Sequence, residues 1–395
     1  MQLLEDKPHY RWIILTLAFL IAFTMHALVF SYAPVIPWII SELSLTHTQA
    51  GFMFSICIFS LSFSRIGWGL ILDRFALRNI VGLSMALIGL SSILRSYTTT
   101  YEVLVVLQLV LGAALGSVLP SLPKLVALWF SLEEEGFATG VYMAGTAVGD
   151  MTGLALTPLL MNWTGSWKTT FIIYGLWSLA LAVVWWVLAK EPTGRKWSAI
   201  RSNVSIMKSL VDVLKMKKVW ILTGFFLCSA VCYDTVSLWI PYILQLKGVC
   251  ATFVGLFSSL LPLGSLLSGP VVGWLFDKVG RRRLIMVILG ATSGFMVFLI
   301  MIGKDMLLYA AIFLVGFCTV GVLTLTLAIP VGFEDRTLTA SAVGIMSSIG
   351  NIGTIAMSVV MGYLKDVTGS FLPALALLAL IAEGMLVLGL LTKDI

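Results

Sequence analysis

Long apolar segments alternate with short polar breaks along the whole chain. A helix needs about 20 mainly apolar residues to cross the hydrocarbon core of a bilayer, and twelve segments meet this length. They lie near 12–40, 51–72, 79–96, 102–124, 137–161, 169–189, 219–245, 252–275, 284–302, 306–329, 339–363 and 370–391. The pattern therefore predicts an all-α polytopic membrane protein with twelve transmembrane helices, whose two ends lie on the same side of the membrane.

The composition excludes several other classes of protein. Hydrophobic residues make up 59% of the 395 residues and charged residues only 11%, which is more apolar surface than a soluble protein of this size can bury. The net charge of +6 is therefore not read as a nucleic-acid signature. The five cysteines lie mostly in apolar segments and lack the neighbours that a zinc site needs. No glycine-rich phosphate loop followed by Lys and Ser or Thr is present. We expect no metal, no cofactor, no nucleic-acid partner and no ATP drive.

Lysine and arginine residues are concentrated in alternate polar breaks. If the N-terminus lies inside, most of the 25 basic residues fall on the cytoplasmic side, as the positive-inside rule requires. The charged stretch from Glu5 to Arg11 leads directly into the first span, so we expect no cleavable signal. The sequence thus predicts a multi-pass protein of the cytoplasmic membrane with both termini cytoplasmic.

The longest polar break divides the chain near its middle. Pro192 and Gly194 end the sixth span, and apolar residues between Met207 and Leu214 then recur at helical spacing between lysines. This pattern is typical of an amphipathic helix lying on an anionic inner leaflet, although a binding site for a partner protein remains an alternative. We predict an N-terminal six-helix bundle over 1–189, a cytoplasmic amphipathic linker over 190–218 and a C-terminal six-helix bundle over 219–395.

The two predicted bundles repeat each other at one fixed spacing. A gapless shift of 204 residues, which carries Asp73 onto Asp277, superposes several marker residues of the first half on the second. The shift places Pro37 on Pro241, Gly112 on Gly316, and Thr164-Gly165-Ser166 on Thr368-Gly369-Ser370. Such a match is hard to obtain by chance, so the chain is interpreted as a duplicated six-span block.

A basic turn between the second and third spans of each half carries a family resemblance. Residues 273–283 read GWLFDKVGRRR, and residues 69–78 read GLILDRFALR, which departs from the same pattern at Ala76 and Leu77. This pattern resembles the loop 2–3 signature of the major facilitator superfamily of transporters. The resemblance implies secondary active transport by alternating access, with solute bound between two six-helix bundles, in a protein that acts as a monomer.

Four ionisable residues lie deep in the spans. The residue at the matching position of the other half is not ionisable in any of the four cases. A polar group in a membrane is expensive and is typically functional, whereas a structural need of the fold should recur in both halves. The four candidate substrate-binding residues are His26, Arg65, Asp150 and Asp234, and the shift places them opposite Ala230, Gly269, Thr354 and Phe30.

Arg65 is the candidate ligand for an anion. Its guanidinium group offers a planar fork of donors that suits carboxylate, nitrate and similar oxyanions. The run from Arg65 to Arg74 is similar to the second helix of nitrate/nitrite porters, in which the arginine binds substrate. The stretch 144–153 resembles their fifth-helix signature more loosely, with Asp150 in place of an asparagine, and the second substrate arginine of that family is absent. A structural ion pair of Arg65 with Asp150 or Asp234 is the alternative.

Asp150 and Asp234 are the candidate proton carriers. Burial in a low-dielectric cavity favours the protonated form of a carboxyl group, although each could instead be a fixed counter-ion. His26 can carry a proton near neutral pH, and its alternative role is that of a hydrogen-bonded packing residue. Glycines at intervals of three to four residues indicate close helix packing; they include Gly112, Gly116, Gly145, Gly149, Gly153, Gly344, Gly350 and Gly353.

Charged residues of opposite sign occupy the predicted cytoplasmic loops. We hypothesise that they form an inner gate whose ion pairs act as a network, since single pairs at a wet rim are weak. Simple topology and solvation are the alternative explanation. The gating candidates are Asp73, Arg74, Arg78, Asp277, Lys278, Arg281, Arg282, Glu135 and Glu334.

These observations predict a proton-coupled symporter of a small anionic solute and not an enzyme. A proton-driven exporter of cationic or amphipathic drugs is the alternative with the same fold, but its fifth-helix motif requires Gly-Pro where this chain has Gly149-Asp150. A membrane solute sensor is a more remote alternative, because sensors usually carry a soluble domain. An intramembrane protease would need a Ser–His pair or paired acids, and the sequence has no such signature.

Overall fold

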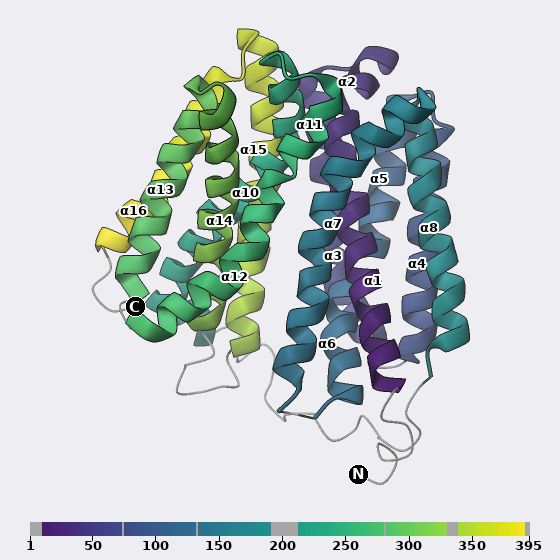
Figure 1. The fold of residues 1–395 in the computed structure, drawn as a ribbon. Coiled ribbons are helices and arrows are strands. Elements are labelled where there is room, and N and C mark those ends of the chain that lie inside the picture. The colour runs from purple at the N-terminus through teal and green to yellow at the C-terminus, as the bar shows by residue number, and fades with distance from the viewer. Residues whose placement is uncertain are drawn as a thin grey trace. The chain divides into compact units, whose positions relative to one another are not determined.

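The computed structural model describes residues 10–72, 75–131, 133–190, 212–279, 282–329 and 339–391. All regular secondary structure in these ranges is helical (Figure 1). The chain divides into two compact units. Unit 1 comprises residues 1–45 and 56–201, and unit 2 comprises residues 46–55 and 202–395, so the third helix begins in unit 2 and continues in unit 1.

The helices of the first half follow the predicted spans. They are α1 (Tyr10–Phe30), α2 (Tyr32–Leu43), α3 (His47–Leu72), α4 (Leu77–Ser96), α5 (Tyr101–Leu115), α6 (Val118–Trp129), α7 (Glu135–Thr164) and α8 (Trp167–Leu188). The first predicted span is formed by α1 and α2 in succession, and the fourth by α5 and α6. Each of the other four corresponds to a single helix.

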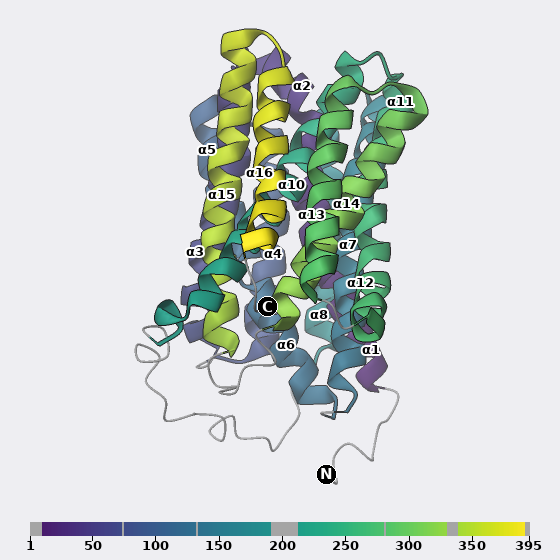
Figure 2. The same cartoon turned by 90° about the vertical axis from the view of Figure 1, so that its left-hand side faces the viewer.

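The second half follows its predicted spans in the same way. Its helices are α10 (Lys217–Leu246), α11 (Ala251–Ser258), α12 (Leu260–Val279), α13 (Arg282–Ile302), α14 (Asp305–Ala328), α15 (Thr339–Thr368) and α16 (Leu372–Leu391). The eighth predicted span consists of α11 and α12. Helices α13 and α16 run side by side in unit 2 (Figure 2).

Eleven stretches of the described chain are long and apolar enough to cross a membrane. Helix α7 lies outside these eleven although it has 30 residues, which is about 45 Å of helix and longer than the hydrocarbon core. Its glycines, threonines and Asp150 reduce its hydropathy. The predicted all-α membrane fold is confirmed, and α7 is the helix whose composition departs most from that of a simple span.

The duplication is visible in the turn that precedes the last helix of each half. Gly165 and Gly369 both have φ +69°, a left-handed conformation that ends a helix and favours glycine. Before each glycine a threonine hydroxyl donates to a carbonyl of the preceding turn, at 2.8 Å for Thr164 and 2.6 Å for Thr368. The matched triplets therefore form the same helix end twice.

Glycines bring α7 into backbone contact with α1 in unit 1 (Figure 1). A Cβ atom on Gly145 would lie 2.6 Å from the carbonyl oxygen of Phe19, and one on Gly153 would lie 2.7 Å from that of Ala27. Close packing is confirmed here and at Gly112, Gly116, Gly149, Gly350 and Gly353, whereas nothing lies within 4 Å of such an atom on Gly344.

Most of the predicted linker lies outside the described residues. Of the range 190–218, the structure describes only residue 190 and residues 212–218, of which 212–215 are helical. The predicted amphipathic stripe and the predicted domain boundaries remain predictions.

Candidate functional site

His26 and Asp150 join the first and fifth spans of unit 1. The Nδ1 atom of His26 on α1 lies 2.7 Å from Oδ1 of Asp150 on α7, and the two side chains are 25% and 7% exposed. An ionised carboxylate only accepts hydrogen bonds, so in that state the proton between them is carried by Nδ1 of the imidazole. Gly149 allows this approach, because a Cβ atom there would lie 2.9 Å from the Cβ of His26.

Asp234 and Thr354 join the equivalent spans of unit 2. The hydroxyl of Thr354 on α15 donates to Oδ2 of Asp234 on α10 at 3.1 Å. Thr354 is fully buried and Asp234 is half-buried. The next residue on α10, Tyr233, lies with its hydroxyl 3.4 Å from that of Ser265 on α12. Tyr233 was not among the predicted site residues.

The two polar pairs occupy corresponding helices of the duplicated fold. Asp150 and Thr354 are equivalent under the 204-residue shift, and each contacts a polar residue of the first span in its own unit. Their partners are not equivalent, because Asp234 corresponds to Phe30, which follows His26 by about one helical turn. Three of the four residues that lack sequence counterparts, namely His26, Asp150 and Asp234, thus each contact a polar side chain within their own unit. Of these two pairs, only the one in unit 1 combines a carboxylate with an imidazole.

Arg65 lies on α3 in the part of that helix that belongs to unit 1. Its side chain is half-buried, and its Nε atom is buried without a hydrogen-bond partner among the described residues. No ion pair between Arg65 and Asp150 occurs in the described part of unit 1, where the Asp150 carboxylate contacts His26 instead. The arginine therefore presents a cation with an unused donor inside the membrane span.

Arg95 is a second buried cation, in the last turn of α4, which sequence reasoning did not select. It is only 1% exposed at the end of α4, and its guanidinium donates to Oε1 of Gln108 at 3.0 Å and to the hydroxyl of Ser92 at 3.2 Å. The guanidinium also lies 4.2 Å from the ring centroid of Phe171 on α8. These contacts tie α4 to α5 and α8. The shift places Arg95 opposite Leu299, so the comparison that found Arg65 could also have found it.

Two of the basic residues near the predicted gate donate hydrogen bonds to backbone carbonyls in the last turn of a neighbouring helix. Arg78 donates to the carbonyl of Trp186 near the end of α8. Arg283 donates to the carbonyls of Gly389 and Leu390 near the end of α16, both at 2.6 Å. Basic side chains at these positions satisfy the unpaired carbonyls of a helix terminus. Both halves thus use an arginine of the basic turn in the same way.

The remaining gating candidates stay predictions. Lys278 lies over the ring of Trp274 at 4.8 Å, and Glu135 occupies the first turn of α7. The neighbouring Glu134 forms a 2.9 Å ion pair with Arg11. Four candidates lie outside the described residues, and of Asp277 and Arg282 only the backbone is described; the four are Asp73, Arg74, Arg281 and Glu334.

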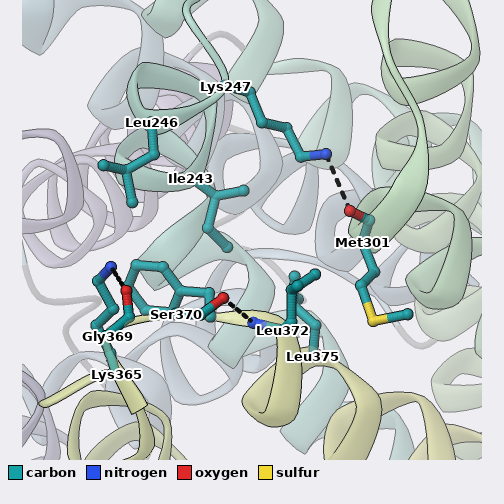
Figure 3. A pocket seen from close by; sticks show the side chains of 10 residues that line it. Ile243, Leu246, Lys247, Met301, Lys365, Gly369, Ser370, Leu372 and Leu375 are labelled. Carbon is teal, nitrogen blue, oxygen red and sulfur yellow. Dashed lines mark hydrogen bonds between the residues drawn. The ribbon is translucent and has the colours of Figure 1, made fainter. Parts of the chain in front are cut away.

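A cavity of about 320 Å³ opens in unit 2 where α10 ends and α16 begins (Figure 3). Lys247 on one side donates to the carbonyls of Met301 and Gly303, and Lys365 on the other donates to that of Gly369. Burial, together with the charge of Lys304, lowers the pKa of Lys247. No predicted substrate-binding residue lines this cavity, so it is distinct from the polar pairs.

Comparison with known proteins places the chain among transporters. The family profile described as Major Facilitator Superfamily matches residues 18–329 and 247–394. The chain is 26% identical to the uncharacterized transporter YybO of Bacillus subtilis (strain 168), over 90% of this chain and 86% of that protein. It is 23% identical to a gallate transporter of Pseudomonas putida, over 91% of this chain and 87% of that protein.

A solved structure shares the fold. The chain superposes with a TM-score of 0.75 on a bacterial homologue of the human lysosomal transporter Spinster, in an inward-facing and unoccupied conformation. The match covers 97% of this chain and 94% of that chain at 14% sequence identity, so it bears on the fold alone.

Proposed function

Because this chain belongs to the Major Facilitator Superfamily of transporters, we propose that it carries an organic anion across the cytoplasmic membrane in symport with a proton. The observation that carries the proposal is that, in the described part of unit 1, the buried cation and the buried carboxylate do not form an ion pair with each other. Arg65 has an unused buried donor, while the Asp150 carboxylate is held by His26. A cation is thus available to the solute, and a separate acid–imidazole pair is available to the proton.

The anionic nature of the cargo follows from Arg65. An intramembrane guanidinium stays charged and is stabilised by an oxyanion that accepts two of its hydrogen bonds. Its described surroundings provide no ion-pair partner, so the solute would supply the missing negative charge. The gallate transporter among the relatives carries an aromatic carboxylate by its name, which supports the same class of cargo. The same cation repels the positively charged cargo of a drug exporter.

Proton coupling follows from the contact between His26 and Asp150. A proton taken up by this pair, whose atoms lie 2.7 Å apart, would cancel its net negative charge. Neutralising the pair changes the electrostatic field in unit 1, where Arg65 is proposed to bind the anion. Asp234 is the second proposed proton carrier, and the hydroxyl of Thr354 donates to its carboxylate. Alternating access of a monomer, with both termini cytoplasmic, completes the proposal.

Uptake into proteoliposomes tests this function. The purified full-length protein is reconstituted, and uptake of radiolabelled gallate, benzoate and sulfoacetate is compared with uptake of ethidium, with and without an inward proton gradient. We expect gradient-driven uptake of at least one anion, which a protonophore abolishes, and no uptake of the cationic dye. Dye transport without anion transport would reverse the assignment of the cargo. Anion uptake that is indifferent to the protonophore would exclude proton symport.

A further inference from the structure

Two lysines line one cavity of unit 2. Lys247 and Lys365 lie on opposite sides of the cavity of about 320 Å³ where α10 ends and α16 begins (Figure 3). The other described residues that line it have apolar side chains, apart from Ser370 and Gly369. Neither lysine forms an ion pair with a described residue. The cavity therefore carries two positive charges that no carboxylate among its described lining residues balances.

Both ammonium groups keep hydrogen-bond donors that the described protein does not use. An ammonium group has three N–H donors. Lys247 gives two of them to carbonyls at the end of α13, at 3.1 and 2.9 Å, and Lys365 gives one to the carbonyl of Gly369 at 2.6 Å. Asp366, which follows Lys365 in sequence, accepts instead from two backbone N–H groups at the start of α3. An oxyanion in the cavity can accept the remaining donors in charge-assisted hydrogen bonds.

Unit 1 supplies its own carboxylate at the corresponding position. The 204-residue shift places Leu246, which lines the cavity, opposite Glu42. In unit 1 the Glu42 carboxylate forms a 2.5 Å ion pair with Lys168, and the shift places Lys168 opposite Leu372, which also lines the cavity. Unit 2 thus has a leucine where unit 1 has the carboxylate that neutralises its lysine. An external anion in the cavity would take the place of that carboxylate.

The cavity lies where candidate membrane spans of unit 2 end. Three of these spans end at Leu246, Ile302 and Thr368, and a fourth begins at Leu372. Leu246 and Leu372 are 54% and 51% exposed, whereas Leu375 in the cavity wall is buried. A lysine near the end of a span places its ammonium group at the level of the lipid headgroups and keeps its stem in apolar surroundings. The cavity therefore combines cations at headgroup level with an apolar wall.

A second cavity also includes Lys247 but has a different balance of charge. This cavity of about 280 Å³ is lined by Lys304 and by Asp305, so a carboxylate of the protein is already present there. The charge of Lys304, after burial, helps to lower the pKa of Lys247. The surroundings of Lys247 are therefore positive on both sides, and the cavity shared with Lys365 is the one in which an anion would relieve this repulsion.

We propose that the cavity between Lys247 and Lys365 binds the phosphate of an anionic phospholipid, whose acyl chains pass the exposed rim at Leu372. The chemistry recognised is an oxyanion joined to an apolar group. A volume of about 320 Å³ is at the lower end of the range for small-molecule sites, so the cavity holds a headgroup and not a whole lipid. Two lysines favour a headgroup with net negative charge over a zwitterionic one, whose own cation they repel. The predicted topology assigns the site to the outer leaflet, and the proposal does not depend on the cargo.

Acylation of individual lysines in lipid nanodiscs tests the proposal on the full-length protein. The uncharged reagent N-acetoxysuccinimide modifies only the neutral amine, and mass spectrometry of peptides gives the rate at each lysine. Rates in nanodiscs of phosphatidylcholine alone are compared with rates in nanodiscs that also contain phosphatidylglycerol. Each rate is divided by that of Lys168, which is paired with Glu42 and reports the general effect of an anionic surface. Phosphatidylglycerol should slow Lys247 and Lys365 at least about fivefold, since occupancy protects them by mass action. Equal relative rates in the two lipids would overturn the proposal.

Glycerol phosphate distinguishes a lipid from a free anion. It carries the same oxyanion without acyl chains, and at millimolar concentration in phosphatidylcholine nanodiscs we expect it to leave both lysines unprotected. Protection as strong as that given by phosphatidylglycerol would overturn the assignment to a lipid.

Two variants of Leu246 separate charge from shape. Leu246→Glu provides the carboxylate that unit 1 has in Glu42, so it should abolish the effect of phosphatidylglycerol on Lys247 and Lys365. Leu246→Gln is the matched control of the same size without charge, and it should keep the lipid effect. Both thermal unfolding midpoints should stay near that of the wild type, because Leu246 is half exposed at the end of its span. Equal protection of the lysines in the two variants would overturn the proposal.

Discussion

His26 and Asp150 form a 2.7 Å contact between α1 and α7, and the corresponding helices of unit 2 are joined by Thr354 and Asp234 at 3.1 Å. The duplicated fold thus places a polar pair between the same two spans of each unit, with different chemistry in each. An imidazole and a carboxylate can share and exchange a proton, whereas a threonine hydroxyl can only donate to its carboxylate. This difference makes unit 1 the proposed centre of proton coupling.

Replacing Asp150 by Asn should uncouple transport from the proton. The amide oxygen can still accept from Nδ1 of His26, so we expect little change in the thermal unfolding midpoint. The amide does not titrate, so concentrative uptake driven by a proton gradient should be lost. Exchange of labelled for unlabelled anion across the membrane requires no net proton movement and should persist. The measurement is gradient-driven uptake and counterflow of the same anion in one proteoliposome preparation.

Retention of gradient-driven accumulation in Asp150→Asn would contradict this assignment. Asp234→Asn is the informative comparison, because the second proposed carrier lies in the other unit. If Asp234→Asn alone uncouples transport, the proton site lies between α10 and α15, and His26 is a packing residue.

Two replacements of Arg65 should distinguish the contribution of its positive charge to anion uptake from that of its planar guanidinium geometry. Arg65→Ala removes the cation, and anion uptake should fall by at least about a hundredfold, since a charge-assisted bidentate contact contributes a few kcal/mol. Arg65→Lys keeps the charge but loses the planar fork, so its apparent KM should rise more than its maximal rate falls. Uptake against anion concentration gives both quantities. Arg95→Lys is the matched control for a buried arginine; it should lower the thermal unfolding midpoint, because Arg95 ties three helices together.

The contact between Thr354 and Asp234 predicts a graded series. Thr354→Val keeps the shape of the side chain but removes the donor, and it should destabilise the protein by roughly 1–3 kcal/mol. Thr354→Ser keeps the hydroxyl and should recover most of that loss. The measurement is the thermal unfolding midpoint of each variant, which should be lower for Thr354→Val than for Thr354→Ser. Equal midpoints for Val and Ser would show that the 3.1 Å contact contributes nothing to stability.

The sequence was sufficient to predict the spans, because their length and apolar character are set by the bilayer. It also selected His26, Arg65, Asp150 and Asp234 as candidate site residues, since charge in a membrane is costly wherever it occurs. It did not predict that His26 contacts Asp150. Depth along a helix can be counted from the sequence, but the face that each helix presents to its neighbour depends on packing.

Sequence reasoning missed Asp366 for a different reason. Its carboxylate accepts hydrogen bonds from the backbone N–H groups of His47 and Thr48 at the start of α3. Asp366 lies near the end of a span, where an acidic residue is ordinarily solvated, so its charge carried no signal. The run from Thr46 to Gln49 does match the Thr-x-x-Gln capping box, and this pattern indicates where the helix begins. No local pattern indicates that the remaining N–H groups are capped by a residue 319 positions away.

Gly149 should be the position in α7 where a single methyl group damages both stability and transport. A Cβ atom there would lie 2.4 Å from the carbonyl oxygen of Phe23, so Gly149→Ala has to push α1 away from α7. Overpacking of this kind costs roughly 1–3 kcal/mol, and it also lengthens the contact between His26 and Asp150.

Gly140→Ala is the control on the same helix, because nothing lies within 4 Å of a Cβ atom at that position. Alanine is the better helix former by up to about 1 kcal/mol, so the control should be neutral or stabilising. The two substitutions are chemically identical, so opposite signs of their shifts in thermal unfolding midpoint would isolate the contact between α1 and α7, and equal shifts would contradict it.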